Sequence, residues 1–179
     1  MANIVKKVKD FALDSVMKSL EGKNPKTATP LLNLVMPHVI PFNRPLGLRI
    51  KKLSLSSSEV ELPFRRGNQN HLGGLHACAL ATIGEYTAGL LLLRRMDPAK
   101  QRLVLKTLRA DYSKQGRATA LAVAEWPEAQ FKGVADFKTS EETHDIEMLT
   151  TLYGSDRVEL ARITTLWQVK PWAKVRKGS

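Results

Sequence analysis

Three polar residues stand at suggestive distances in an otherwise apolar part of the sequence. Asn70 and His76 flank a turn that contains two glycines, and Glu85 follows His76 by nine residues in a run that is apolar on nearly every side. A helix that is apolar all round must be covered by other elements or by lipid. A carboxylate near the middle of such a helix is expensive to bury. We therefore expect Glu85 to have a role, and the rest of the chain to cover its helix.

Each of these residues also has a simpler interpretation when it is taken alone. His76 could cap the helix, and Glu85 could be a buried acid paired with an arginine from a neighbouring strand. The pair Gly73-Gly74 alone indicates only a turn. It is the combination of the three features that favours a functional site.

Several familiar kinds of site are absent from the sequence. No cluster of His, Cys, Asp and Glu stands at metal-ligand spacing, no Walker-type glycine loop occurs, and no G-x-S-x-G elbow marks a serine hydrolase. Cys78 is the single cysteine, which excludes an intrachain disulfide and a multi-cysteine metal site. Its apolar neighbours favour a packing role over that of an activated thiol at a helix start. We expect neither a metal nor a cofactor.

The composition predicts a basic globular protein of one domain. Lys and Arg number 28 against 17 Asp and Glu, so the net charge is +11. Such a charge implies an anionic partner, which could be nucleic acid, a phosphate-bearing ligand or an anionic membrane surface. Aromatic residues make up only 6% of the chain, so the pattern of single-strand binders is missing. The N-terminus has no secretory signal pattern, and we expect a cytoplasmic location.

Residues 75–93 need a separate test, because 19 residues are about the length of a membrane-spanning helix. The segment contains Glu85, two threonines and two glycines, and an acid in mid-span is costly. The flanking segments alternate as strands do. We interpret the segment as a buried core helix and expect no integral membrane insertion.

The first third of the chain predicts helices followed by a hairpin. Residues 3–20 have the spacing of an amphipathic helix, and a second short helix is predicted at 29–36. Three prolines predict a non-helical connector at 37–45. Two strands, 46–55 and 59–64, are joined by a serine turn and form a predicted hairpin.

The remainder of the chain predicts four strands after the long helix. The basic residues that end the helix complement the negative end of its dipole. The later elements are a strand at 101–112, a turn at 114–117, a partner strand at 118–126, a short helix or loop at 127–136, and a hairpin of 146–153 with 158–169. One helix segregated from a run of strands indicates an α+β fold in which an antiparallel sheet curls around that helix.

At this point the residues resemble a known family. The pattern Asn70-x-x-Gly73-x-x-His76, with Glu85 nine positions later, resembles the signature of hotdog-fold acyl-CoA thioesterases. The nearest branch contains the phenylacetate-pathway thioesterase and the human acyl-CoA thioesterase superfamily members. The resemblance implies a hotdog fold, an antiparallel β-sheet wrapped around one long central helix, and a homodimer or a dimer of dimers.

The resemblance divides the chain into three parts. Residues 1–45 would form an N-terminal helical arm and connector, 46–170 the hotdog domain, and 171–179 a basic C-terminal tail. The arm lies outside the resemblance.

The resemblance also implies roles for the motif residues. Glu85 would be the general base or the nucleophile toward a thioester carbonyl, and burial would raise its pKa toward neutrality. The backbone amide of Ala77, at the helix start, would stabilise the oxyanion. Asn70 would position the water or the motif loop, and His76 would hold the loop or contact the carbonyl.

The basic charge agrees with coenzyme A, which carries phosphates. The residues that we assign to substrate or CoA binding are Arg65, Arg66, Gly73, Gly74, Lys114 and Arg117. Ala77 and Cys78 stand where the family commonly has two glycines. This difference leaves a non-catalytic acyl-lipid or CoA-binding hotdog protein as the alternative. A basic nucleic-acid- or membrane-associated protein is a third hypothesis, although we expect no nucleic-acid partner.

Overall fold

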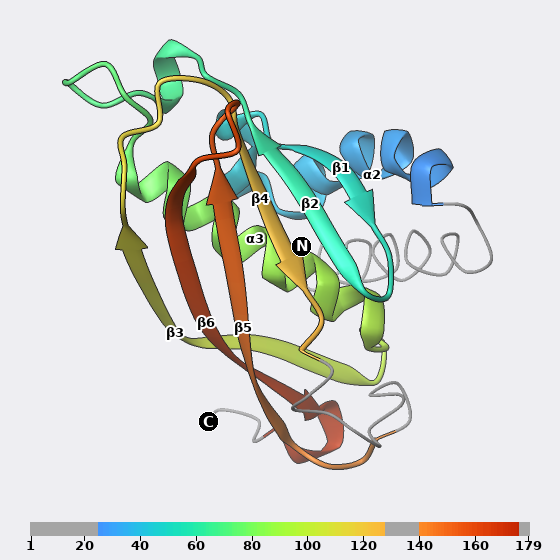
Figure 1. The fold of residues 1–179 in the computed structure, drawn as a ribbon. Coiled ribbons are helices and arrows are strands. Elements are labelled where there is room, and N and C mark those ends of the chain that lie inside the picture. The colour runs from blue at the N-terminus through green and yellow to red at the C-terminus, as the bar shows by residue number, and fades with distance from the viewer. Residues whose placement is uncertain (1–24, 128–139, 176–179) are drawn as a thin grey trace.

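The computed structural model of the protein describes residues 25–127 and 140–175. The helix predicted at residues 3–20 and most of the segment predicted at 127–136 lie outside the described residues. Within them, one six-stranded antiparallel sheet curls around a long helix, α3, in the strand order β1-β2-β4-β5-β6-β3 (Figure 1). The strands are β1 Arg49–Leu53, β2 Ser57–Leu62, β3 Gln101–Tyr112, β4 Ala120–Glu125, β5 His144–Tyr153 and β6 Glu159–Pro171. The α-helices are α2 Pro25–Val39 and α3 Ala77–Arg95, and the short 3-10 helices are η1 Pro41–Leu46, η2 Arg66–Asn68 and η4 Trp172–Lys174. The predicted α+β architecture is therefore confirmed.

Helix α3 is the centre of the core, as predicted. It contacts all the strands of the sheet, and Ile83, Leu90 and Leu92 are almost completely buried. By length and composition alone α3 could also cross a membrane. Because its apolar sides are buried against the sheet, a core helix accounts for that composition.

Two glycines let α3 approach β6 closely. A Cβ atom at Gly84 would lie 2.6 Å from the Cβ atom of Ile163, and one at Gly89 would lie 3.2 Å from the Trp167 ring. The Thr150 hydroxyl of β5 donates to the Gly84 carbonyl at 3.0 Å. The helix is thus held against the sheet at a separation that only glycine permits.

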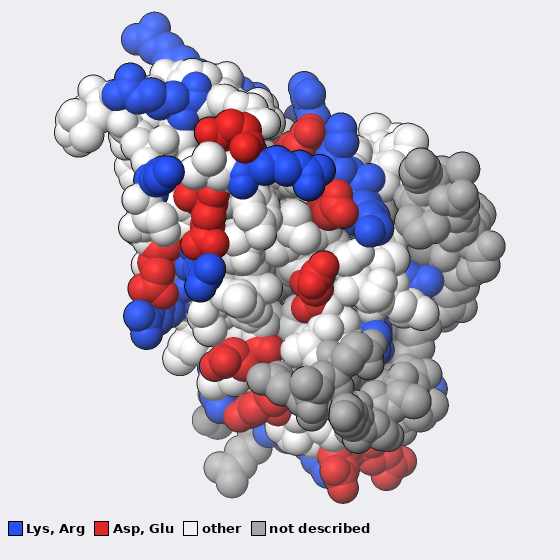
Figure 2. All heavy atoms as spheres, viewed as in Figure 1, with Lys and Arg blue, Asp and Glu red and all other residues white. Residues whose placement is uncertain are grey.

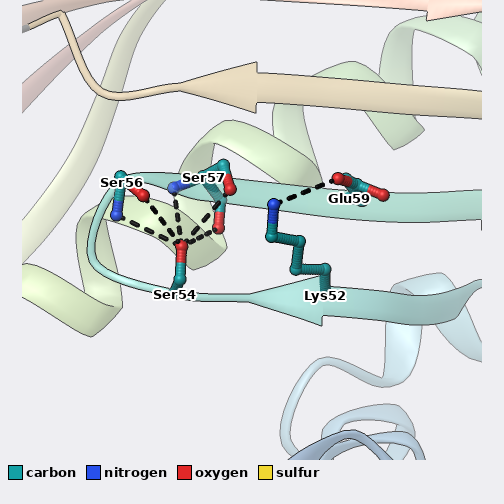
Figure 3. A network of polar contacts seen from close by, with 5 residues as sticks. All are labelled: Lys52, Ser54, Ser56, Ser57 and Glu59. Carbon is teal, nitrogen blue, oxygen red and sulfur yellow. Dashed lines mark hydrogen bonds and ion pairs between the residues drawn. The ribbon is translucent and has the colours of Figure 1, made fainter. Parts of the chain in front are cut away.

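The serine turn joins β1 and β2 as the predicted hairpin. The Ser54 hydroxyl oxygen accepts hydrogen bonds from the amides of Ser56 at 3.2 Å and Ser57 at 2.9 Å (Figure 3). Lys52 and Glu59 form an ion pair across the strands at 3.5 Å. Local side-chain bonds of this kind favour a turn over a continued strand.

The second helix is longer than predicted and belongs to the core. In α2, Leu32 and Met36 are almost completely buried, and the Asn33 side chain pairs with the backbone of Ile50 in both directions, at 2.7 and 2.9 Å. Part of the segment predicted to be an arm therefore covers the β1 edge of the sheet, as Figure 1 shows.

The prediction of a non-helical connector at residues 37–45 is wrong. Pro37 lies in the last turn of α2, and Pro41–Leu46 form the 3-10 helix η1. Pro41 is tolerated because it occupies the first position of η1, where a helix start leaves its amides without acceptors. Gly47 ends η1 with a φ of 63°, a left-handed conformation that favours glycine.

The predicted pairing of the strand at 101–112 with the strand at 118–126 is also wrong. β3 pairs with β6 at the sheet edge, whereas β4 lies between β2 and β5. The segment between β3 and β4 is hydrogen-bonded to other parts of the chain. The Leu75 amide donates to the Gly116 carbonyl and the Ser113 amide donates to the Leu160 carbonyl, both at 2.8 Å. The chain therefore passes from the β3 edge of the sheet to a position between β2 and β5, where it forms β4 (Figure 1). The β5–β6 hairpin is confirmed.

The close approach of α3 to β6 predicts an asymmetry between two glycines. We expect Gly84→Ala to lower the free energy of unfolding by about 1–3 kcal/mol, because the new methyl group overlaps Ile163. Gly67→Ala is the matched control, since a Cβ atom there has no neighbour within 4 Å. Urea unfolding of both variants measures the difference, and equal stability of the two would contradict this packing.

Candidate functional site

Glu85 lines a cavity of about 340 Å³ between α3, η1 and the sheet. Most of its walls are apolar. The lining residues are Ile40, Phe42, Asn43, Glu85, Tyr86, Gly89, Leu90, Leu93, Leu103 and Trp167. A concave, mainly apolar site with a few polar groups is the usual form of a small-molecule pocket.

The Glu85 carboxylate has no hydrogen bond or ion pair within residues 25–127 and 140–175. Burial raises the pKa of Glu85 above its ordinary value, because it penalises the charged form. The interpretation of Glu85 as an acid paired with a core arginine therefore finds no support in the described residues. An unpaired carboxylate at an apolar cavity is a group that can accept or release a proton.

Asn70 organises the motif loop at the start of α3. Its side-chain oxygen accepts hydrogen bonds from the amides of Leu72 at 2.9 Å and Gly74 at 3.1 Å. The Asn70 amide donates to the Gly74 carbonyl at 2.8 Å, and Gly73 has a φ of 72°. Asn70 therefore fixes the loop, which is one of the two roles predicted for it.

His76 caps α3. Its ring Nδ1 atom accepts a hydrogen bond from the Cys78 amide at 3.1 Å, and its own amide donates to the Asn68 carbonyl at 2.8 Å. Ala77 is the first residue of the helix and is exposed, and an amide at this position has no acceptor within the helix. The Tyr112 hydroxyl donates to the Ala77 carbonyl at 2.9 Å. The helix start thus presents the Ala77 amide at the surface.

The predicted residues form two groups that are far apart in one chain. Asn70, His76 and Ala77 lie together at the start of α3. Glu85 lies eight residues beyond Ala77, which corresponds to about 12 Å along a helix that rises 1.5 Å per residue. Both groups cannot touch one carbonyl group from the same chain.

Two of the predicted cations lie near the motif loop. Lys114 and Arg117 line a second cavity, of about 380 Å³, which the turns after β3 and β5 form. Arg117 donates to the Gln115 side-chain oxygen at 3.0 and 3.2 Å, and a Cβ atom at Gly74 would lie 2.5 Å from the Gln115 side chain. The Gln115 side chain therefore lies between the second cavity and the motif loop that Asn70 fixes.

The other two predicted cations precede the motif loop in sequence and contact different residues. The Arg65 guanidinium donates to the Pro45 carbonyl and covers Gly47, and Arg66 is exposed at the start of η2. The structure does not bring them to the cavity that Lys114 lines.

Sequence reasoning missed three residues of these sites. Tyr86 and Asn43 line the Glu85 cavity, and Tyr112 contacts the helix start. Tyr86 could have been identified from the sequence, because it directly follows Glu85 in the predicted helix. Asn43 had no signal, because it lies in a proline-rich segment whose structure was predicted incorrectly. Burial, and then the nearby charge of Glu85, raise the pKa of Tyr86, so that its phenol stays protonated.

Surface charge on the outer face of the sheet is mixed in sign. Figure 2 shows Lys and Arg among Asp and Glu on this face, and the ion pairs Lys51–Glu61 and Lys106–Asp145 lie at 3.5 and 2.6 Å. Among the described residues no group of three or more His, Cys, Asp or Glu could hold a metal ion.

Comparison with known proteins gives both a family and a fold. The family described as a domain of unknown function, DUF4442, matches residues 29–169. No curated protein gives a significant match. A Pseudomonas aeruginosa protein of unknown function, described as a "Probable Thioesterase", is 22% identical with a TM-score of 0.68, over 80% of this chain and 95% of that one.

Two further solved structures are similar. A substituted form of a second Pseudomonas aeruginosa thioesterase is 18% identical with a TM-score of 0.65, over 80% of this chain and 94% of that one. A substituted Staphylococcus aureus thioesterase is 14% identical with a TM-score of 0.61, over 73% of this chain and 99% of that one. The chain belongs to the DUF4442 family and has the hotdog fold, as predicted.

The raised pKa of Glu85 predicts a pH-dependent effect of its substitution. The folded protein keeps the Glu85 proton to a higher pH than the unfolded chain does, so this group lowers stability as pH rises between the two pKa values. We expect Glu85→Gln to gain stability relative to the wild type as pH rises through that window, and the gain to become constant above it. Urea unfolding of both proteins at several pH values measures this difference. A difference that does not change with pH would show that the carboxyl is not desolvated.

Proposed function

We propose that the protein is a thioesterase that hydrolyses an acyl-CoA or a related acyl thioester. The observation that carries this proposal is the Glu85 carboxylate, which lines an apolar cavity and has no partner in the described residues. Its raised pKa suits a general base that works near neutral pH. The apolar walls suit the acyl part of a thioester, and the named thioesterases of the same fold are consistent with this substrate class.

In the general-base form of the reaction, Glu85 takes a proton from water as the water oxygen attacks the thioester carbonyl carbon. The carbonyl oxygen becomes an oxyanion. When the carbon–sulfur bond breaks, the leaving thiolate takes the proton from Glu85, and the products are a carboxylic acid and a thiol. In the nucleophilic form, the carboxylate attacks first and water hydrolyses the resulting anhydride, with the same products.

The oxyanion needs a donor at about 3 Å from the developing charge. The Ala77 amide suits this task, but it lies about 12 Å from Glu85 along the same helix. We therefore propose that the site lies between two copies of the chain. Glu85 of one copy faces Ala77, His76 and Asn70 of the other, so a homodimer is the smallest active unit. A dimer of dimers would contain the same pairwise site.

The β3 edge of the sheet is the proposed contact between the copies. Among the described residues, the twelve-residue strand β3 pairs with β6 on one side and with no strand on the other. A long open edge is a surface that proteins cover, and a second copy can cover it by antiparallel pairing. The Tyr112 hydroxyl at the end of β3 already contacts Ala77, which places the helix start beside this edge.

Coenzyme A is the proposed carrier. Lys114 and Arg117 at the 380 Å³ cavity offer cations to its phosphates, next to the motif loop. Arg65, Arg66 and the loop glycines Gly73 and Gly74 remain proposed contacts of the same ligand.

One observation favours a second candidate, an acyl-CoA-binding protein without turnover. The Cys78 amide already donates to the His76 ring, so it is not free to join the Ala77 amide in binding an oxyanion. Release of free thiol from a panel of acyl-CoAs distinguishes hydrolysis from binding alone.

Substitution of Glu85 tests the proposed function directly. We expect Glu85→Gln to lower kcat/KM for acyl-CoA hydrolysis by about 10²- to 10⁴-fold, because the variant has no base or nucleophile. The assay is thiol release, and the oligomeric state and thermal unfolding of the variant serve as controls. Full activity in a folded Glu85→Gln dimer would contradict the assignment.

A mixing experiment tests whether the site is shared. Ala77→Pro removes the amide donor but suits the first position of a helix, and His76 has the extended backbone (ψ 136°) that a following proline requires. We expect Ala77→Pro and Glu85→Gln to be inactive alone. Refolded together, they should regain about a quarter of wild-type activity, because half of the dimers are mixed and contain one intact site of two. No recovery in dimers shown to be mixed would place the site within one chain.

A further inference from the structure

Two buried polar side chains at the Glu85 cavity are not used by the proposed mechanism. Asn43 is 7% exposed and Tyr86 is 6% exposed. The Asn43 backbone amide donates to the Ile40 carbonyl at 3.1 Å. The Asn43 side-chain amide and the Tyr86 hydroxyl have no hydrogen-bond partner in the part of the chain that the structure describes.

The lack of partners is informative because this protein satisfies a comparable group nearby. Asn33 lies in the adjacent α2, and its side chain donates to and accepts from the Ile50 backbone. Because the polar atoms of Asn43 and Tyr86 are not fully enclosed by protein, a molecule in the cavity can reach them, whereas apolar residues would suffice if these two positions only lined its wall. Their polarity therefore indicates a ligand atom.

Asn43 and Tyr86 also form the boundary between two cavities. Both line the 340 Å³ cavity that contains Glu85, and both line a smaller cavity of about 30 Å³. The other walls of the smaller cavity are Asn33, Met36, Pro37, Arg44, Gly47 and Leu48. This volume holds about one water-sized group. The two cavities thus share Asn43 and Tyr86 as part of their walls.

We propose that Asn43 and Tyr86 form a polar subsite that binds a hydroxyl or carbonyl oxygen of the acyl group. The substrate class is then an acyl thioester that carries an oxygen substituent away from the thioester carbon. This inference rests on the proposed function, because it identifies the part of the substrate that enters the Glu85 cavity.

The chemistry of the two side chains fits such an oxygen. Tyr86 remains a neutral phenol, because burial and then the charge of Glu85 raise its pKa, so it donates a hydrogen bond. The Asn43 amide can both donate and accept. A ligand hydroxyl can accept from Tyr86 and donate to Asn43, whereas a ligand carbonyl can accept from both. The carbon part of the acyl group would contact Leu90 and Trp167.

Binding of two matched probes tests the subsite without catalysis. p-Cresol and toluene differ only by a hydroxyl group, and neither contains a thioester. We expect the full chain to bind p-cresol about tenfold more tightly than toluene in titration calorimetry or ligand-detected NMR, the effect of one good hydrogen bond. Tyr86→Phe and Asn43→Leu should each remove most of this preference, while toluene binding stays within about twofold.

Two control variants keep the test specific. Tyr153→Phe removes a hydroxyl from a tyrosine on β5 that does not line either cavity, and it should keep the tenfold preference. Glu85→Gln should also keep it, although this variant loses hydrolysis. Thermal unfolding of Tyr86→Phe should match the wild type, because the hydroxyl has no partner to lose. An undiminished preference in Tyr86→Phe, or no preference in the wild type, would overturn the subsite.

The outcome of the probe-binding experiment is independent of the test of hydrolysis. If Glu85→Gln hydrolyses acyl-CoA normally, the proposed function fails, whatever the probes show. If Glu85→Gln loses hydrolysis and Tyr86→Phe keeps the probe preference, the function stands and the subsite fails. As a second readout, hydrolysis of 8-hydroxyoctanoyl-CoA relative to octanoyl-CoA should fall in Tyr86→Phe and stay unchanged in Tyr153→Phe.

Discussion

The partial burial of one carboxylate at a mainly apolar cavity is the constraint on which this structure depends. Glu85 lies on a helix whose other sides are packed against the sheet, and nothing in the described residues neutralises it. A charge in such a place destabilises the folded protein unless it is protonated or used. The fold keeps the carboxylate at a cavity rather than in closed packing, and the proposed function accounts for why that arrangement is retained.

The geometry of α3 has a second consequence. The capped helix start and the carboxylate are fixed at two positions on one rigid element, because the glycines that face β6 hold the helix close to the sheet. A rigid helix cannot bend to bring the Ala77 amide to Glu85. Under the proposed function, a complete thioester site requires a second copy, for which we propose the β3 edge, unpaired among the described strands, as the contact surface. Fold, site and assembly are thus linked through one helix.

Sequence patterns predicted the elements whose signals are local. The long helix, the serine-turn hairpin, the strand at Gln101–Tyr112 and the last hairpin all follow from periodicity and turn residues within a short stretch. The partner of β3 could not be predicted in this way, because the bonds of Leu75 and Ser113 that direct the chain away join residues far apart in sequence.

The candidate site likewise contains residues that the sequence could identify and residues that it could not. The family resemblance selected Glu85 and the motif loop, in which Asn70 fixes the loop and His76 caps the helix. It could not select Asn43, because that residue matters only through the cavity that η1 forms beside α3. Pro41, which would break the interior of an α-helix, is compatible with the first position of the 3-10 helix η1, and η1 supplies part of the cavity wall.

The pH dependence of hydrolysis tests the central claim, that the half-buried Glu85 carboxylate carries the proposed reaction. For a general base or a nucleophile, kcat/KM should fall as pH decreases through the pKa of Glu85 in the free enzyme. The account predicts an inflection above the ordinary glutamate range, at the same pH at which the Glu85 carboxyl titrates by carbon-13 NMR. A rate profile that is flat across that titration would contradict it.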